Sequence, residues 1–266
     1  MRWLCLLLLF AAEASAAGTD WLIERRQPAP SVLGGGDSLQ RELTRLQGRY
    51  SAENVAFSGQ YEYRILDIEG GQPAHNGHLH QLGLSLSGQG QDWQWSLSSG
   101  VNGSSNSFAN QRFHRDHWVL TGGILRSLPE TNAGQFSLGL AGDYRFGGFR
   151  AYPRLDVTAE VAGLDWQLQA PVMLAVSDAD QRWRLALERV GSKWGVFDRS
   201  LAVESAVYLS QWQLTAEWRL GATGPLDWRL AAGHDFSSRL VYTDLALGRV
   251  QDTPSSQSWV GIRLAF

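Results

Sequence analysis

Apolar and polar residues alternate along most of the chain after residue 54. In a β-strand, successive side chains point to opposite faces, so a period of two predicts strands with one apolar and one polar face. Leu82, Leu84 and Leu86 share one face, for example, with polar or small residues between them. The pattern recurs in successive segments separated by turn residues, and its longest apolar face runs over 164–176. The sequence therefore predicts an all-β fold.

Alternation alone fits two architectures. In a water-soluble sandwich the apolar faces form the core, whereas in a membrane barrel they face lipid and the polar faces line the lumen. Segment length favours the barrel, because several segments reach ten or more residues and a tilted strand needs about 9 to 11 to cross a bilayer. Twelve Trp and 29 Gly suit the same reading, because tryptophan favours bilayer interfaces and glycine permits tight turns.

The first residues predict an export signal over 1–16. Arg2 is a basic start, residues 4–10 are apolar, and residues 14–16 are a small-residue cleavage site. The only cysteine, Cys5, lies inside this signal, so the mature chain has no thiol or disulfide chemistry. A net charge of −3 without a long basic run predicts no nucleic-acid partner.

The last strand carries a more specific pattern. Val260, Ile262, Leu264 and the terminal Phe266 fall on one face. This arrangement resembles the closing strand of Gram-negative outer-membrane β-barrels, a class in which the barrel-assembly machinery reads such a terminal signal. The resemblance covers about residues 50–266 and is to the class, not to a named family. It implies a place in the outer membrane, surrounded by outer-membrane lipid, with the assembly machinery as a partner.

We therefore predict a transmembrane antiparallel up-and-down β-barrel over 51–266, with about twelve strands and ten to fourteen left open. A count of segments gives about thirteen, and an even number is expected when both chain ends lie in the periplasm. The doubtful stretch is 186–198, where residues 189–195 break the alternation. We treat it as loop, which gives twelve strands; a missed short strand would give fourteen.

Residues 17–50 differ in character and are predicted to form a periplasmic extension. Residues 27–30 and 34–36 are typical of a linker. Between them and the barrel, Asp37 or Ser38 could cap a short helix with Leu39, Leu43 and Leu46 on one side. A plug in the lumen, a docking helix for a periplasmic or envelope protein, and a mobile leader all remain open.

Connections and registers follow from the same pattern. With the amino terminus periplasmic, residues 69–76, 103–115 and 233–239 are expected outside the cell, and 129–132 and 162–163 in periplasmic turns. A turn at 222–224 would place Glu217 opposite Arg229 and Arg219 opposite Asp227. A turn at 146–149 would bring Asp143 near Arg154 and Arg145 near Tyr152.

The lumen is predicted to hold a network of compensating charges. Whether this network forms a charged pore constriction or a salt-bridged core that fills the barrel stays open. Its members are Asp143, Arg145, Arg154, Asp156, Glu160, Asp165, Arg182, Arg184, Glu188, Glu204, Glu217, Arg219, Asp227, Arg229 and Arg263.

Histidines gather near the outer rim. His75, His78, His80, His114 and His117 are weak metal candidates, because imidazoles bind divalent metals but this spacing matches no closed structural site. No cofactor is predicted. Lipid-modifying barrel enzymes carry a His-x-Ser arrangement that this chain lacks, so no catalytic residue is assigned.

The favoured function is a small channel or transport accessory with a charged polar lumen. A non-conducting structural or assembly-partner barrel is the alternative, and an outer-membrane lipid-modifying enzyme ranks third.

Overall fold

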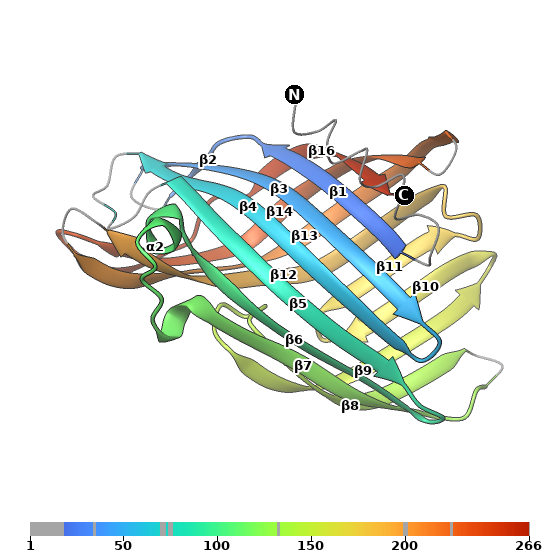
Figure 1. Ribbon diagram of the computed structural model, residues 1–266. Coiled ribbons are helices and arrows are strands. Elements are labelled where there is room, and N and C mark those ends of the chain that lie inside the picture. Colours follow the sequence, from blue (N-terminus) through green and yellow to red (C-terminus); the bar gives the residue numbers. More distant parts are fainter. Residues whose placement is uncertain are drawn as a thin grey trace.

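The computed structural model describes residues 19–33, 36–69, 73, 77–131, 134–198, 202–223 and 226–265. The predicted signal over 1–16 with Cys5, the candidate ligand His75 and the terminal Phe266 lie outside the described residues. The described strands form one antiparallel sheet that curves and closes into a barrel (Figure 1).

Sixteen strands belong to the described sheet. Two of them, β2 and β15, are short additions at one end, so that fourteen strands form the ring. In chain order the strands are β1 (Thr19–Pro28), β2 (Ser31–Val32), β3 (Ser38–Ala52), β4 (Val55–Glu69), β5 (Gly77–Gln89), β6 (Trp93–Ser104), β7 (Trp118–Ser127), β8 (Gln135–Asp143), β9 (Arg150–Val161), β10 (Leu164–Ala170), β11 (Met173–Asp178), β12 (Trp183–Asp198), β13 (Val203–Thr223), β14 (Leu226–Asp244), β15 (Gly248–Asp252) and β16 (Gln257–Ala265). Between β6 and β7 lie the helix α2 (Ser105–Ala109) and the 3₁₀ turn η2 (Arg115–His117).

The first strand closes the ring. β1 pairs with β16 from Leu22↔Ala265 to Pro28↔Trp259, and with β3 from Thr19↔Tyr50 to Arg26↔Leu43. The predicted periplasmic extension over 17–50, and its helix over 37–46, are therefore wrong for the described part of that segment. In lipid, every backbone N–H and C=O needs a partner within the sheet. Strand pairing therefore outweighs the helical spacing of the leucines.

The ring has fourteen strands, the upper end of the predicted range and not the favoured twelve, because 186–198 is no loop. β12 runs unbroken through it and pairs with β13 from Trp183↔Trp218 to Asp198↔Val203. The expected outer loop at 233–239 likewise lies within β14, which continues to Asp244. The strands β12 to β14 are therefore longer than predicted, all at the same end of the barrel.

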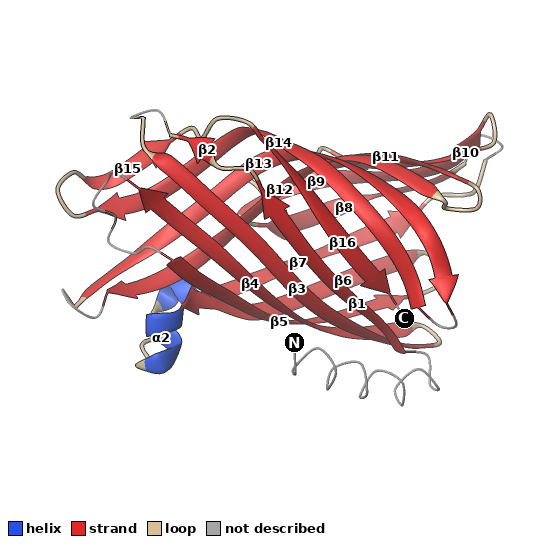
Figure 2. Ribbon diagram, turned by 90° about the horizontal axis from the view of Figure 1, so that it is seen from above, coloured by secondary structure: helices blue, strands red, loops and turns tan. Residues whose placement is uncertain are grey.

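The two ends of the barrel differ. Short connections at 53–54, 90–92 and 162–163 share one end with Thr19 and Ala265, and we name it the termini end. Glu69, Gly77 and the longer connection at 105–117 lie at the other, the loop end, where Figure 2 shows α2, β2 and β15. By the rule for bacterial barrels, the loop end faces the cell exterior.

The outer wall is apolar, as predicted. Outward side chains over a third exposed include Leu82, Leu84, Trp93, Trp95, Leu97, Trp118, Leu120, Leu138, Leu140, Trp166, Leu174, Trp218, Leu220, Trp228, Leu230, Val260 and Ile262. A water-soluble fold would bury such a set, whereas a barrel wall presents it to lipid. No described helix is long and apolar enough to span a membrane.

The ring narrows toward the loop end. Up to Val101↔Trp118 the neighbour of β6 is β7, but beyond it β12 takes that place through a parallel bridge, Gly195↔Gly103. The Asn102 side-chain amide also donates to the Lys193 carbonyl at 2.8 Å. The loop-end parts of β3 to β6 and β12 to β14 therefore face each other at close range, without β7 to β11 between them.

Candidate functional site

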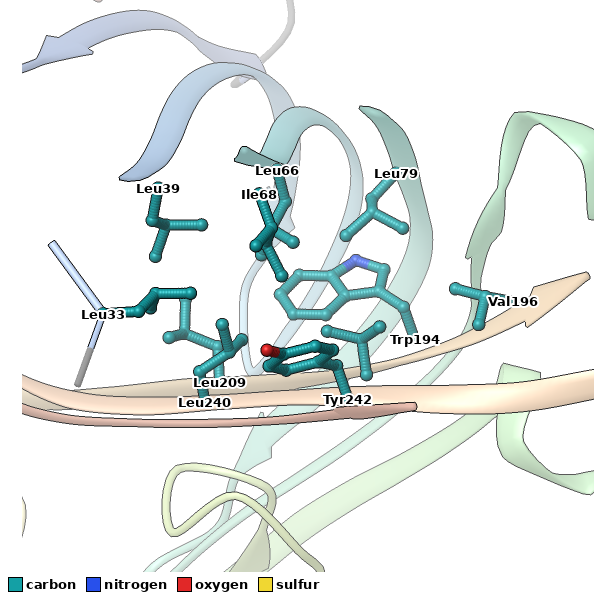
Figure 3. Packing of buried hydrophobic residues seen from close by; sticks show 11 residues of the cluster. Leu33, Leu39, Leu66, Ile68, Leu79, Trp194, Val196, Leu209, Leu240 and Tyr242 are labelled. Atoms are coloured by element: carbon teal, nitrogen blue, oxygen red, sulfur yellow. The ribbon is translucent and has the colours of Figure 1, made fainter. Parts of the chain in front are cut away.

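An apolar core fills the narrow part of the barrel. Leu39, Leu66, Ile68 and Leu79 from β3 to β5 meet residues of β12 to β14 across the interior (Figure 3). Trp194 stands at the centre, 1 % exposed. The remaining members are Leu33, Val196, Val207, Leu209, Leu240 and Tyr242. Interiors of this kind pack without room for water.

A polar layer lies directly beneath this core. The Arg64 guanidinium stacks 5.3 Å from the Trp194 ring centroid and marks the boundary. Arg41 donates to Gln211 Oε1 at 2.6 Å and to Gln257 Oε1 at 3.1 Å. These groups border a cavity of about 330 Å³ lined mainly by arginine, glutamine and acidic side chains. The interior here can hold water or a small polar solute.

A network of ion pairs fills the next layer. Glu24, 1 % exposed, lies 2.6 Å from Arg26, 3.4 Å from Arg45 and 3.0 Å from Arg263. Arg45 continues at 2.9 Å to Glu62, which also binds Arg64 at 2.9 Å. The network therefore links β1, β3, β4 and β16 around a set of buried carboxylates.

Arg263 extends the network along the wall to β13, two strands away from β16. It reaches Glu217 on β13 at 2.5 Å, and Arg184 and Arg229 lie 3.9 and 4.0 Å from the same carboxylate. Asp227 then binds Arg229 at 3.0 Å and Arg219 at 2.9 Å. Long arginine side chains from seven strands, β1, β3, β4, β12, β13, β14 and β16, thus meet in the lumen. Networks of this kind occupy small barrels with side chains.

The structure brings together only part of the predicted charge set. Arg184, Glu217, Arg219, Asp227, Arg229 and Arg263 share the network above. Arg154 and Asp156 pair with each other on β9 at 2.6 Å, and Asp143 pairs with Arg145 at 3.3 Å beyond β8. Glu188 lines the central cavity with Arg145.

Other members of the set lie apart from this network. Arg182 is 68 % exposed in a turn, where it pairs with Asp178 and Asp180. Glu160 lies opposite Asp165 at the termini end, and Glu204 is exposed at the start of β13.

The predicted hairpin registers are wrong in detail. The pairs observed are Trp218↔Leu230 and Arg219↔Arg229, and a bulge between Arg219 and Gly221 shifts the rest. The Arg219–Asp227 contact still forms, because a long arginine side chain spans the shifted positions. In the second hairpin Asp143 lies opposite Arg150, and its carboxylate accepts a hydrogen bond from the Tyr152 hydroxyl at 2.7 Å.

Sequence reasoning missed half of the network. Glu24, Arg26, Arg41 and Arg45 lie in the segment taken for a linker, and Glu62 and Arg64 in a strand that received no register. Charged residues on one strand face, as in Arg41 and Arg45 four positions apart, were the available signal. It was masked because Leu39 and Leu43 share that inward face.

The rim histidines each have a local partner. His78 Nδ1 is hydrogen-bonded to Tyr63, and His114 and His117 pack edge to face with ring centroids 4.3 Å apart. His117 is fully buried against Gly103 and Gly195, and burial lowers the pKa of its imidazole below the usual value. Within the described ranges no three His, Cys, Asp or Glu side chains gather as metal ligands would.

His80 has a hydrogen-bond partner at each of its two ring nitrogens. Its Nε2 lies 2.7 Å from Ser105 Oγ, and its Nδ1 lies 2.8 Å from the Tyr61 hydroxyl. The ring is also held between aromatic side chains, with Phe108 edge-on at 5.6 Å and Tyr63 tilted at 5.4 Å. His80 shares the outward face of β5 with Leu82 and Leu84, so this group lies on the outside of the barrel.

The closed ring, the exposed apolar belt and the charged interior together define a transmembrane β-barrel of the outer-membrane type. The outer membrane is therefore the location of the chain.

Comparisons with known proteins stop at this level. No family model matches the chain, and no curated protein matches it. Among solved structures, a Pseudomonas aeruginosa FadL homologue is 11% identical, with 93% of this chain and 88% of that one covered and a TM-score of 0.42. Neisserial surface protein A is 9% identical over 94% and 98%, with a TM-score of 0.28. The translocator domain of autotransporter NalP from Neisseria meningitidis is 9% identical over 95% and 91%, with a TM-score of 0.36.

Proposed function

We propose that this chain is a non-conducting outer-membrane barrel that acts through its outer surface. The second of the functions considered from sequence, a non-conducting structural or assembly-partner barrel, is thereby placed ahead of the small channel. The apolar core around Trp194 carries the proposal, because moving an ion from water into a packed and mainly apolar layer costs far more free energy than the few polar groups there could return.

The ion-pair network beneath the core supports the same proposal. Its carboxylates Glu24, Glu62 and Glu217 are at most 6 % exposed, and each is held by at least two arginines. Separating such pairs to open a path would leave charges unpaired in a poorly hydrated interior, at several kcal/mol each. We infer that the network stiffens the barrel and fixes its cross-section.

The test is single-channel recording across a planar bilayer. Protein refolded from residues 17–266 should give no discrete current steps. A difference in gel mobility between the unheated and the heated sample shows that the barrel is folded. Steps of constant size from the folded protein would refute the closed barrel and restore the channel with its charged lining. Trp194→Ala, which removes the largest side chain of the core, should be the first variant to leak.

Assembly and partners belong to the same proposal. We infer that the pattern of Val260, Ile262 and Leu264 on β16 is read by the barrel-assembly machinery, since β16 also closes the ring against β1. Outer-membrane lipid is the surrounding partner, in contact with the exposed belt.

A further inference from the structure

The outer surface carries a chain of three polar side chains that no function described above uses. Ser105, His80 and Tyr61 come from α2, β5 and β4, and they are joined through Ser105 Oγ, the two His80 nitrogens and the Tyr61 hydroxyl at 2.7 and 2.8 Å. A serine hydroxyl bonded to an imidazole whose other nitrogen is held by a third group is the arrangement of an activated nucleophile.

The position of Ser105 and His80 along the membrane normal matches the depth at which the ester groups of lipids lie. His80 pairs with Gly103, about ten residues along β6 from the exposed Trp93 near the termini end. Ten residues extend ~33 Å along a strand, or ~25 Å along the membrane normal at a tilt of ~40°, which is the height of the apolar band. Ser105 therefore lies where the hydrocarbon of the outer leaflet meets its polar headgroups.

An apolar groove leads up to this point. It is an open depression of about 750 Å³ on the lipid-facing wall, with Gly59 in its floor. Tyr61 belongs both to the groove and to the hydrogen-bonded chain, so the two features are continuous. The groove is also lined by Leu82, Leu84, Val101 and Trp118.

The occupant of the groove follows from its position. Leu82, Leu84 and Trp118 are between 49 and 59 % exposed on a surface that faces hydrocarbon. An acyl chain of a neighbouring lipid is the only abundant molecule at that depth, and small residues in a wall allow it to approach the backbone closely.

We propose that Ser105 is the nucleophile of an acyl-ester hydrolase that acts on lipids of the outer leaflet. The inference deepens the proposed function, on which it rests for a barrel that acts through its outside. It revises the absence of a catalytic assignment from sequence, which looked for His-x-Ser along the chain. Here histidine and serine are 25 residues apart and meet only in the fold.

The reaction would run in two steps. Ser105 Oγ attacks the ester carbonyl carbon and its proton passes to His80 Nε2; the bond to the alcohol oxygen breaks, and His80 returns the proton to that oxygen. An acyl-serine ester remains. Water then attacks the same carbon with His80 as base, which releases a free fatty acid and restores the serine.

Tyr61 is a positioning residue in this scheme. When its oxygen accepts a hydrogen bond from the Nδ1–H group of His80, Nε2 is the unprotonated ring nitrogen and can take the serine proton. The aromatic side chains around His80 fix the plane of the ring.

A long-chain alkyl fluorophosphonate is the first probe. In folded protein in detergent micelles, Ser105 Oγ should displace fluoride and gain the phosphonyl mass, which peptide mapping locates. Ser105→Ala and His80→Asn should abolish the label. Ser258→Ala is the matched control, because Ser258 Oγ also lies 3.0 Å from a histidine nitrogen, that of His234. Labelling at Ser258 equal to that at Ser105, or no labelling, would overturn the proposal.

Turnover distinguishes the lipid. The folded protein is incubated with mixed micelles of diacyl phosphatidylethanolamine or of lipopolysaccharide, and released fatty acid is measured. Release from one substrate identifies the ester; release from neither overturns the hydrolase even if the probe labels. His80→Asn should lower kcat about 10²- to 10⁴-fold, and Tyr61→Phe should lower kcat with KM unchanged and shift the acidic limb of the pH profile. An unchanged profile would make Tyr61 merely structural.

Conductance is recorded on the same preparations. Current steps without loss of ester cleavage would refute the closed barrel alone, and silent protein without cleavage would refute the hydrolase alone.

Discussion

At the scale of single residues, the chain buries an unusual number of charges. Glu24 is the clearest case, since one carboxylate with 1 % exposure serves Arg26, Arg45 and Arg263. Buried charges are tolerated only when they are paired, because desolvation of a lone ion costs far more than a hydrogen bond returns. The pairing of each side chain is therefore a condition for the fold.

Glu24→Gln should destabilise the barrel strongly. The neutral amide leaves three arginines around it with less compensation, and breaking a buried ion pair costs about 3 to 5 kcal/mol. Urea unfolding in lipid bilayers, followed by tryptophan fluorescence, measures the free energy. Asp180→Asn is the control, because Asp180 is 72 % exposed and pairs with an exposed arginine. Equal midpoints for the two variants would show that the network does not hold the barrel together.

At the scale of elements, the apolar face of the long strands is outside the barrel in one half of the strand and inside it in the other half. On β12, Trp183 and Leu185 alternate with inward Arg184, but beyond Val190 the inward residues become Trp194 and Val196. The same reversal occurs on β13 and β14, where Leu209 and Leu240 point inward. The termini-end half meets lipid outside, and the loop-end half needs a core inside, so one strand carries two opposite patterns.

The contact between β12 and β6 depends on two glycines packed on one ring. A Cβ at Gly195 would lie 2.4 Å from His117 Nδ1, and one at Gly103 would lie 2.7 Å from the same ring. No side chain fits there while the imidazole stays in place.

Gly195→Ala should therefore loosen the loop-end half. Overpacking of this kind costs about 1 to 3 kcal/mol, and Gly195→Ala/His117→Ala should recover part of it by removing the ring. Thermal unfolding of the single and double variants measures the coupling. Gly59→Ala is the matched strand control, since its Cβ would meet only Leu84 at 3.7 Å. Additive losses in the double variant would mean that the ring does not bridge the strands.

At the scale of the whole molecule, closure depends on the first strand. β1 joins β16 to β3 and contributes Glu24 to the lumen, so the amino-terminal segment is part of the wall. A ring that lacks one strand exposes unpaired backbone to lipid.

A chain that begins at residue 30 should fail to fold in the membrane. Proteolysis of reconstituted vesicles and the gel shift on heating measure the outcome, with a chain from residue 17 as the control. A plug, which the sequence left open for this segment, would give the opposite result, because its removal would leave a folded and more conductive barrel. A protected, heat-modifiable truncated barrel would contradict the fourteen-strand closure.

The class of the protein could be predicted from the order of its residues. Alternation is a local property of a strand, so the apolar belt, the inward face of Glu217, Asp227 and Arg263, and the pattern of β16 could all be read without coordinates. The export signal over 1–16 stays a prediction from the order of residues. Strand number could not be settled, because the reversal on β12 looks like the end of alternation.

The contacts inside the barrel and on its outer surface could be seen only in the folded chain. The core around Trp194 joins residues from Leu39 to Tyr242, and Glu24 meets Arg263 only because the ring closes. Ser105 and His80 become partners because α2 turns back over β5 after leaving β6. These contacts depend on which strands are neighbours around the ring, and pairing between distant strands is set by global closure, which no local pattern of residues encodes.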